Sequence, residues 1–95
     1  MGKKLKFCII LNVNASGGRK LRLINKVIYL LNVDHDIELF KTTSEEAAKE
    51  IFKNLSVKNF DRLVLAGGDG SVCFGVNQIL KYPYLEGKKI GYIPT

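Results

Sequence analysis

Residues 67–71, Gly-Gly-Asp-Gly-Ser, are the segment of this 95-residue chain whose residue types are best suited to chemistry. They follow the apolar run 63–66 and precede a segment with helical character. Glycines let backbone N–H groups approach an anion closely, and the start of a helix adds a partial positive charge. The segment therefore predicts a phosphate-binding turn between a strand and a helix. Asp69 would lie beside that phosphate, where a carboxylate can hold a metal ion or accept a proton.

Two further polar turns follow apolar segments of the chain. Residues 14–18, Asn-Ala-Ser-Gly-Gly, come after the apolar run 7–13, and residues 42–44, Thr-Thr-Ser, come after residues 37–41. The sequence has neither the P-loop pattern nor a dinucleotide-binding G-x-G-x-x-G after its first apolar run. The expected phosphate site therefore uses neither of these two motifs.

The apolar periodicity alternates between strand and helix. Continuous apolar runs predict strands, and spacings of three and four predict helices, with Thr43 or Ser44 as the cap of the second helix. The expected strands are 6–13, 37–41, 62–66 and 89–93, and the expected helices are 19–31, 44–55 and 71–81. This β-α-β-α-β-α-β order predicts an α/β fold with a parallel, doubly wound sheet in three layers. In such sheets ligands bind beyond the carboxyl ends of the strands, where all three polar turns fall.

Two details of packing also follow from the pattern. In the third helix we expect the inward side to carry Val72, Gly75, Val76, Ile79 and Leu80. We expect the two cysteines, Cys8 and Cys73, to be buried reduced thiols of a cytoplasmic protein, because they lack the spacing of metal ligands.

Length and composition narrow the class of protein. Ninety-five residues allow one small domain, and a hydrophobic content of 46% is that of a globular chain. The apolar runs are too short to span a bilayer. The net charge of +6 suits anionic partners such as nucleotides or acidic lipid headgroups. No nucleic-acid-binding motif accompanies the charge, so nucleic acid is not an expected partner.

With its three turns in this order, the chain resembles the amino-terminal lobe of the diacylglycerol kinase catalytic domain family. That family includes sphingosine, ceramide and bacterial lipid kinases, and it shares its nucleotide-binding core with NAD kinases and, more distantly, 6-phosphofructokinases. Its Asn-Pro-x-Ser-Gly turn and basic helix correspond to residues 13–20, and its Gly-Gly-Asp-Gly-Thr to residues 67–71. Further matches are Thr43 (or Thr42) at the end of the second strand, Asn77 in the third helix, and Ile93-Pro94.

The resemblance implies a role for each of these residues. The first and third turns would hold the phosphates of ATP, Thr43 would contact the nucleotide, and Asp69 would orient or deprotonate the acceptor hydroxyl and help to place Mg²⁺. The implied phosphate- and nucleotide-binding residues are Asn14, Ser16, Gly17, Gly18, Thr43, Gly67, Gly68, Gly70 and Ser71. The implied reaction transfers the γ-phosphoryl group of ATP to the hydroxyl of diacylglycerol or a sphingoid lipid. The enzyme would work in the cytoplasm, peripheral to the inner face of the membrane.

The chain departs from the family pattern at two places. The opening Asn-Pro is not matched in register, because Val13-Asn14 stand there unless Asn12 serves across a one-residue insertion. Cys73 and Phe74 stand where the family has Asn or His followed by Glu. A thiol and a phenyl ring cannot supply the charge of a carboxylate or accept its hydrogen bonds.

The family also continues after Ile-Pro with Gly-Thr-x-Asn-Asp and a carboxyl-terminal β-rich lobe. The resemblance therefore implies that residues 1–95 are the amino-terminal, nucleotide-binding part of the catalytic domain, with the second lobe absent. We expect the chain alone to be inactive, and to pair with a second lobe or to self-associate. Two alternatives stay open. One is a non-catalytic nucleotide-binding or interaction module, which Cys73-Phe74 favour, and the other is a NAD kinase-like enzyme with a soluble acceptor.

Overall fold

The computed structural model describes residues 4–13 and 18–94, apart from the side chains of residues 18–21, 69 and 94. Strands and helices alternate along this part of the chain. Their bounds are β1 Lys6–Asn12, α1 Gly18–Asp34, β2 Asp36–Thr42, α2 Glu45–Asn54, β3 Arg62–Gly67, α3 Asp69–Lys81 and β4 Lys89–Pro94. Short 3-10 helices follow α2 and α3, at Leu55–Val57 and Pro83–Leu85. The expected order of elements is confirmed.

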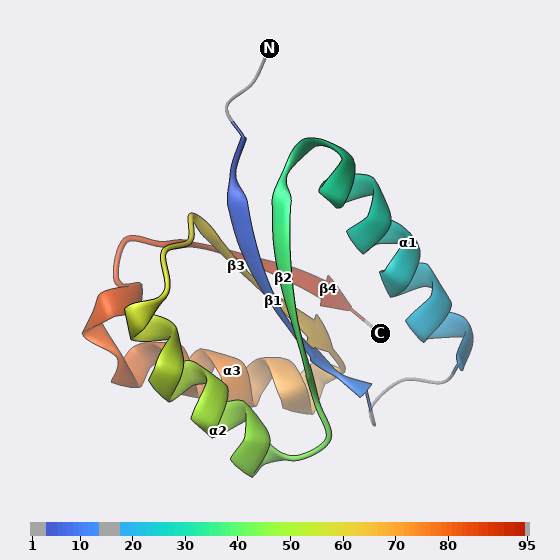
Figure 1. Ribbon diagram of the computed structural model, residues 1–95. Coiled ribbons are helices and arrows are strands. Elements are labelled where there is room, and N and C mark those ends of the chain that lie inside the picture. The colour runs from blue at the N-terminus through green and yellow to red at the C-terminus, as the bar shows by residue number, and fades with distance from the viewer. Residues whose placement is uncertain (1–3, 14–17, 95) are drawn as a thin grey trace.

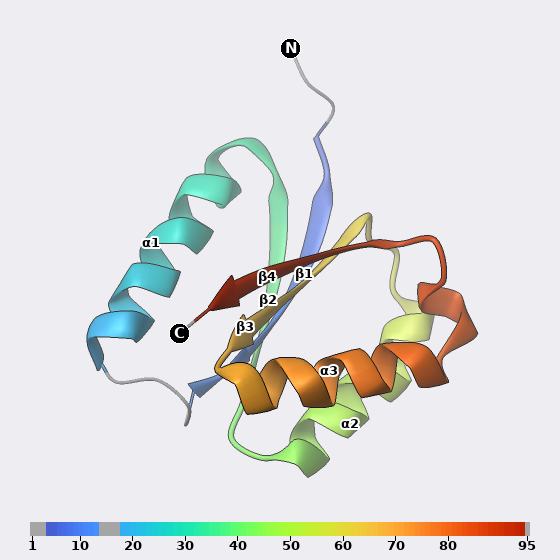
Figure 2. The ribbon, with the colours of Figure 1, turned by 180° about the vertical axis from the view of Figure 1, so that it is seen from behind.

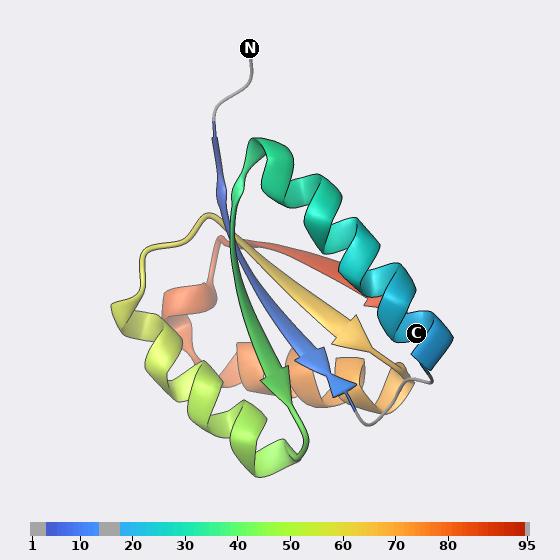
Figure 3. The same cartoon turned by 45° about the vertical axis from the view of Figure 1, so that its right-hand side comes forward.

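The four strands form one parallel sheet in the order β2-β1-β3-β4. Helix α1 covers one face of the sheet, while α2 and α3 lie side by side on the other (Figures 1 and 3). The predicted three-layer α/β architecture is therefore confirmed. Within the described residues, no helix has both the length and the apolar character needed to cross a bilayer.

Strand β1 lies at the centre of the sheet and is buried on both faces. Its residues Cys8, Ile9, Ile10 and Leu11 are at most 6% exposed. Because successive side chains of a strand point to opposite faces, Cys8 and Ile10 join the cluster under α2 and α3, whereas Ile9 and Leu11 join the cluster under α1. This double burial explains why the strand reads as a continuous apolar run. Burial also raises the pKa of the Cys8 thiol.

The strand register brings the carboxyl ends of the strands to the same level. Asn12 at the end of β1 pairs with Thr42 at the end of β2, and Gly67 at the end of β3 pairs with Pro94 of β4. Seen from behind, α3 begins at this edge directly after β3 (Figure 2). The described residues at the ends of the strands therefore share one edge of the sheet, as a parallel sheet requires.

Helix α3 differs from its prediction in its start and in its buried face. It begins at Asp69 rather than at residue 71. Val76 and Leu80, expected to point inward, are 45% and 79% exposed, whereas Gln78 is only 3% exposed. Cys73 is exposed as well, so the expectation that both thiols are buried is wrong for this one.

The close approach of α3 to β3 accounts for this rotation of the buried face. A Cβ atom on Gly75 would lie 2.6 Å from Cδ1 of Leu65, so the absence of a side chain at residue 75 lets the helix backbone approach the strand. The face centred on Gly75 and Gln78 is then the buried one. Each residue of a helix lies about 100° further round the axis than the residue before it. Val76 and Leu80 therefore point away from the face of Gly75 and Gln78, and both are exposed.

The link between α3 and β4 is tied to α2. The Tyr84 hydroxyl donates a hydrogen bond to the carbonyl oxygen of Phe52, and the neighbouring Leu85 is 2% exposed. Burial raises the pKa of Tyr84 to about 12, so the hydroxyl keeps its proton and stays a donor at neutral pH. This contact holds α2 and the end of α3 together on one side of the sheet.

Two leucine-to-alanine substitutions test the burial pattern. Leu63 of β3 is 0% exposed, so Leu63→Ala should lower the free energy of unfolding by about 2–5 kcal/mol. Leu80→Ala should change it by no more than about 0.5 kcal/mol, since this side chain is solvated. Urea unfolding followed by circular dichroism measures both. A large loss for Leu80→Ala would contradict the orientation of α3.

Candidate functional site

Gly67 is the point at which β3 turns into α3, and the geometry there excludes a side chain. Its φ is +157°, and a Cβ atom would lie 2.8 Å from Cβ and 3.0 Å from Oγ of Ser71. Cβ atoms essentially never approach other atoms that closely. The glycine therefore allows Ser71, in the first turn of α3, to pack directly over the end of β3.

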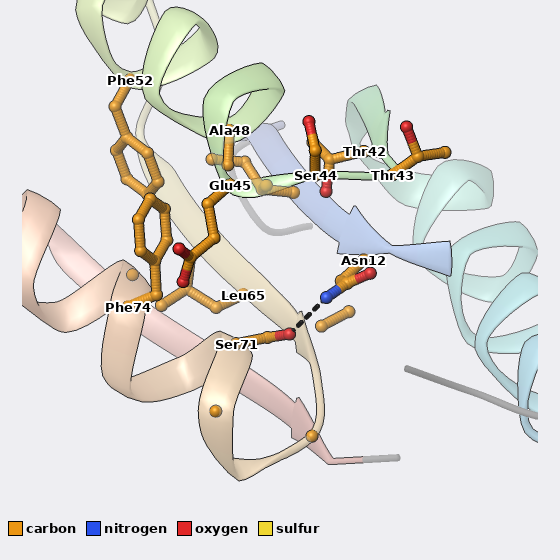
Figure 4. Close-up of a pocket in the computed structure, with 15 residues that line it drawn as sticks. Asn12, Thr42, Thr43, Ser44, Glu45, Ala48, Phe52, Leu65, Ser71 and Phe74 are labelled. Atoms are coloured by element: carbon orange, nitrogen blue, oxygen red, sulfur yellow. Dashed lines mark hydrogen bonds between the residues drawn. The ribbon is translucent and has the colours of Figure 1, made fainter. Parts of the chain in front are cut away.

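Asn12 and Tyr92 tie this junction to the neighbouring strands. The Asn12 Nδ2 atom donates a hydrogen bond of 2.7 Å to Oγ of Ser71, which joins the end of β1 to α3 (Figure 4). The Tyr92 hydroxyl of β4 donates one of 3.4 Å to the carbonyl oxygen of Gly67. Three strands thus hold the start of α3 in place. Asn12, considered above only across an insertion, is the asparagine that the described structure brings to this site.

The start of α3 differs chemically from the start of α2. In α2, the Ser44 side chain caps the helix by accepting a hydrogen bond of 3.2 Å from the Ala47 N–H. The corresponding residue of α3 is Gly68, which has no side chain with which to cap the helix. The first N–H groups of a helix have no partner within it. An anion at the start of α3 would accept hydrogen bonds from such groups, and the helix dipole would favour its negative charge.

Gly68 and Gly70 leave open space beside the backbone. A Cβ atom on either would meet nothing within 4 Å. Gly68 has φ −82° and ψ −177°, values that any residue adopts, and Gly70 is not among the described glycines with positive φ. The protein's own packing therefore does not need glycine at these two positions. A ligand that approaches the backbone closely would need it.

A pocket of about 420 Å³ opens at this edge of the sheet, between α2 and α3 (Figure 4). This volume is in the range of small-molecule sites. Polar side chains line it near Asn12 and Ser71 and at the start of α2, and apolar side chains line the end near Phe52 and Phe74. The lining residues are Ile10, Asn12, Thr42, Thr43, Ser44, Glu45, Ala48, Phe52, Leu65, Ala66, Gly68, Gly70, Ser71, Phe74 and Gly75. Such a pocket fits a ligand with an anionic end and an apolar end.

Thr42 and Thr43 both line the pocket but lie in different environments. Thr42 is buried, and its Oγ1 donates a hydrogen bond of 3.3 Å to the carbonyl oxygen of Leu11. Thr43 is exposed. Thr42 thus fixes the end of β2 against β1, and Thr43 is the more accessible of the two to a ligand. From the sequence, Thr43 is the expected nucleotide contact and Thr42 is the alternative.

The structure gathers only part of the predicted phosphate site. Thr43, Gly68, Gly70 and Ser71 line the pocket, and Gly67 shapes the turn beneath Ser71. Of Gly18 the structure describes only the backbone, as the first residue of α1. For Asp69 the structure describes the backbone, at the start of α3, but not the side chain. Asn14, Ser16 and Gly17 lie outside the described residues.

Sequence reasoning missed several lining residues, above all Glu45, Ala48 and Phe52 of α2. An acidic residue is common at a helix start and apolar residues are common in a core, so these residue types do not by themselves indicate a pocket. Only the placement of α2 beside α3 brings them to it. Phe74, where the chain departs from the family pattern, lines the pocket as well.

Among the described residues, no group of three or more His, Cys, Asp or Glu side chains is placed to hold an ion. Mg²⁺ is commonly held by one or two carboxylates together with substrate phosphates, and this arrangement needs fewer protein ligands.

Comparisons with known proteins identify the family and the fold. The family model of the diacylglycerol kinase catalytic domain matches residues 6–95, and the chain belongs to this family. The fold is similar to that in the crystal structure of a "putative diacylglycerol kinase" from Bacillus anthracis str. Sterne, with a TM-score of 0.78 and 22% sequence identity over 98% of this chain. The chain spans about a third, 32%, of the length of that protein. No curated protein matches the sequence.

The contrast between Gly67 and Gly70 can be tested by alanine substitution. Gly67→Ala should lower the free energy of unfolding by about 1–3 kcal/mol, because the new methyl group forces Ser71 away from the junction. Gly70→Ala should leave it unchanged or raise it by up to about 1 kcal/mol, since the methyl group meets open space in a helix. Urea unfolding checks both, and equal destabilisation by the two would contradict the described junction.

Proposed function

We propose that this chain forms the ATP-binding portion of a lipid kinase, which transfers the γ-phosphoryl group of ATP to a lipid hydroxyl. Membership of the diacylglycerol kinase catalytic domain family supports a lipid kinase-like domain. The observation that best supports nucleotide binding is the composition of the pocket. In it, the start of α3, which has no side-chain cap, and the open backbone at Gly68 and Gly70 adjoin an apolar region. The start of α3 suits a phosphate group, and the apolar region suits a nucleobase.

Each residue of the proposed site has a part in positioning or charge stabilisation, which dominate phosphoryl transfer. The turn at 67–71 holds the ATP phosphates together with Asn14, Ser16, Gly17 and Gly18. Thr43 contacts the nucleotide, and Asp69 orients or deprotonates the acceptor hydroxyl and helps to place Mg²⁺. Bound Mg²⁺ would neutralise charge on the phosphates. The space beside Gly68 and Gly70 is consistent with a phosphate there, since a Cβ atom would fill it.

The acceptor in this proposal is diacylglycerol or a sphingoid-type lipid at a membrane surface. A net charge of +6 favours approach to the anionic inner face of the membrane from the cytoplasm. Residues 1–95 supply the nucleotide-binding part of the catalytic domain, and a second lobe supplies the lipid site. The span of this chain over 32% of the matched Bacillus anthracis structure is consistent with that division.

A titration with Mg-ATP, followed by backbone amide chemical shifts, tests the nucleotide site directly. We expect saturable shifts at residues 14–20 and 67–72. Gly70→Ala should weaken binding on the order of tenfold, equivalent to about 1.4 kcal/mol, because the methyl group keeps the phosphate from the backbone. Asp69→Asn should alter the shifts at the same turn and weaken their dependence on Mg²⁺. The absence of any shift at millimolar ATP would refute the proposal.

Turnover is a separate prediction. We expect the 95-residue chain to bind Mg-ATP without phosphorylating diacylglycerol in mixed micelles, because the described residues leave the pocket open to water, and transfer needs a site that excludes it. Radiolabelled ATP and extraction of lipid products measure this. Formation of phosphatidic acid at a rate that Asp69→Asn abolishes would show that the chain is active by itself. Phosphorylation of NAD⁺ instead would favour a soluble acceptor.

A further inference from the structure

The pocket has an order along its length that the phosphate site alone does not explain. Asn12 and Ser71 form one end, and the apolar side chains Phe52 and Phe74 form the other. The Glu45 side chain extends from the first turn of α2 into the space between these two ends (Figure 4). A carboxylate therefore stands between an anion-binding turn and an apolar region.

We propose, on the basis of the nucleotide function above, that Glu45 binds the ribose hydroxyls and Phe74 stacks on the base of the nucleotide. A nucleotide has phosphate, sugar and base in the same order as the pocket has its polar end, its carboxylate and its aromatic end. An ionised carboxylate only accepts hydrogen bonds, so the part of the ligand that meets it must donate them. The 2′- and 3′-hydroxyls are the donors of a nucleotide at that position.

The surroundings of Glu45 support a role toward a ligand. The ion pairs among the described residues, Lys4–Asp36, Lys6–Glu38 and Lys58–Glu38, use other carboxylates. Within the same residues, no hydrogen bond or ion pair is made by the Glu45 carboxylate, which is exposed and lines the pocket. Its acceptor sites are therefore open to ribose hydroxyls in the part of the chain that the structure describes.

Phe74 and Phe52 differ in how a ligand could reach them. Phe52 is 1% exposed and belongs to the buried cluster under α2 and α3. Phe74 also lines the pocket but is only half-buried, so part of its ring is free to meet a flat group. Bases stack on aromatic side chains with little dependence on sequence, because every base has a π-face. Phe74 is thus the ring we assign to the base.

A simpler role for Glu45 is that an acidic residue in the first turn of a helix interacts favourably with the helix dipole. Glu46 provides a matched control, because it also lies in the first turn of α2 and is exposed, but it does not line the pocket. Glu45→Ala and Glu46→Ala remove the same charge from the same turn. Only Glu45→Ala should affect how the protein distinguishes ligands by their ribose hydroxyls.

The experiment compares dissociation constants of the full chain for Mg-ATP and Mg-2′,3′-dideoxy-ATP, measured by amide chemical shifts. The wild type should bind ATP at least about tenfold more tightly, as expected for hydrogen bonds to a charged group. Glu45→Ala should bring this ratio close to one, whereas Glu46→Ala should leave it at the wild-type value. Phe74→Leu keeps an apolar side chain without a ring. It should weaken both nucleotides equally while leaving binding of inorganic tripolyphosphate unchanged.

The outcomes separate this inference from the proposed function. If ATP binds at the turn 67–71 but the wild type does not distinguish ATP from its dideoxy analogue, the ribose assignment is wrong and the nucleotide function stands. An equal loss of discrimination in Glu46→Ala would overturn the assignment in favour of the helix dipole. If neither ATP nor tripolyphosphate shifts any resonance, both proposals fail. The wild-type comparison requires no variant, so a variant that fails to fold does not prevent the test.

Discussion

The missing side chain at Gly67 is the constraint on which the described site depends. Any Cβ atom there would occupy the place of Ser71, and α3 would have to move away from the end of β3. With glycine, Ser71 approaches closely enough to accept the 2.7 Å hydrogen bond from Asn12 of β1. That bond spans 59 residues of sequence and links the central strand to the helix that follows its neighbour. The position and direction of the start of α3, at one end of the pocket, follow from this contact.

The distribution of helices explains why the pocket lies where it does. Helices α2 and α3 share one face of the sheet, and α1 covers the other (Figure 1). Buried residues such as Phe52, Leu55 and Leu65 fill the space under α2 and α3 for most of their length. At the carboxyl edge the residues between the two helices are smaller, among them Ala48 and Gly70, and a cavity remains. The same packing that stabilises the fold therefore stops where a ligand can enter.

The extent to which sequence could predict this structure varies with the physical origin of each feature. The strands were predictable because a parallel sheet buries both faces, which leaves a continuous apolar run such as residues 8–11. The face that α3 buries was not predictable, because Val76 and Leu80 are as apolar as buried residues. The rotation of the helix about its axis depends instead on the contact of Gly75 with Leu65. The turn at 67–71 was predictable because glycine is a local signal. The contribution of Glu45 depends on how two helices lie relative to each other, which no local pattern encodes.

The placement of a carboxylate on α2 and a phenyl ring on α3 has a consistent electrostatic basis. Phe74 lies at the apolar end of the pocket and is half-buried, so an ionised side chain at this position would lose part of its solvation. Glu45 lies at the exposed rim, in the first turn of a helix, where water and the helix dipole both stabilise its charge. A carboxylate at the rim also stays hydrated until a ligand arrives, so its desolvation is offset by the hydrogen bonds that it then accepts. Among the described side chains that line the pocket, the acidic one thus lies on α2, and the residue before α3, Gly68, has no side chain to cap that helix.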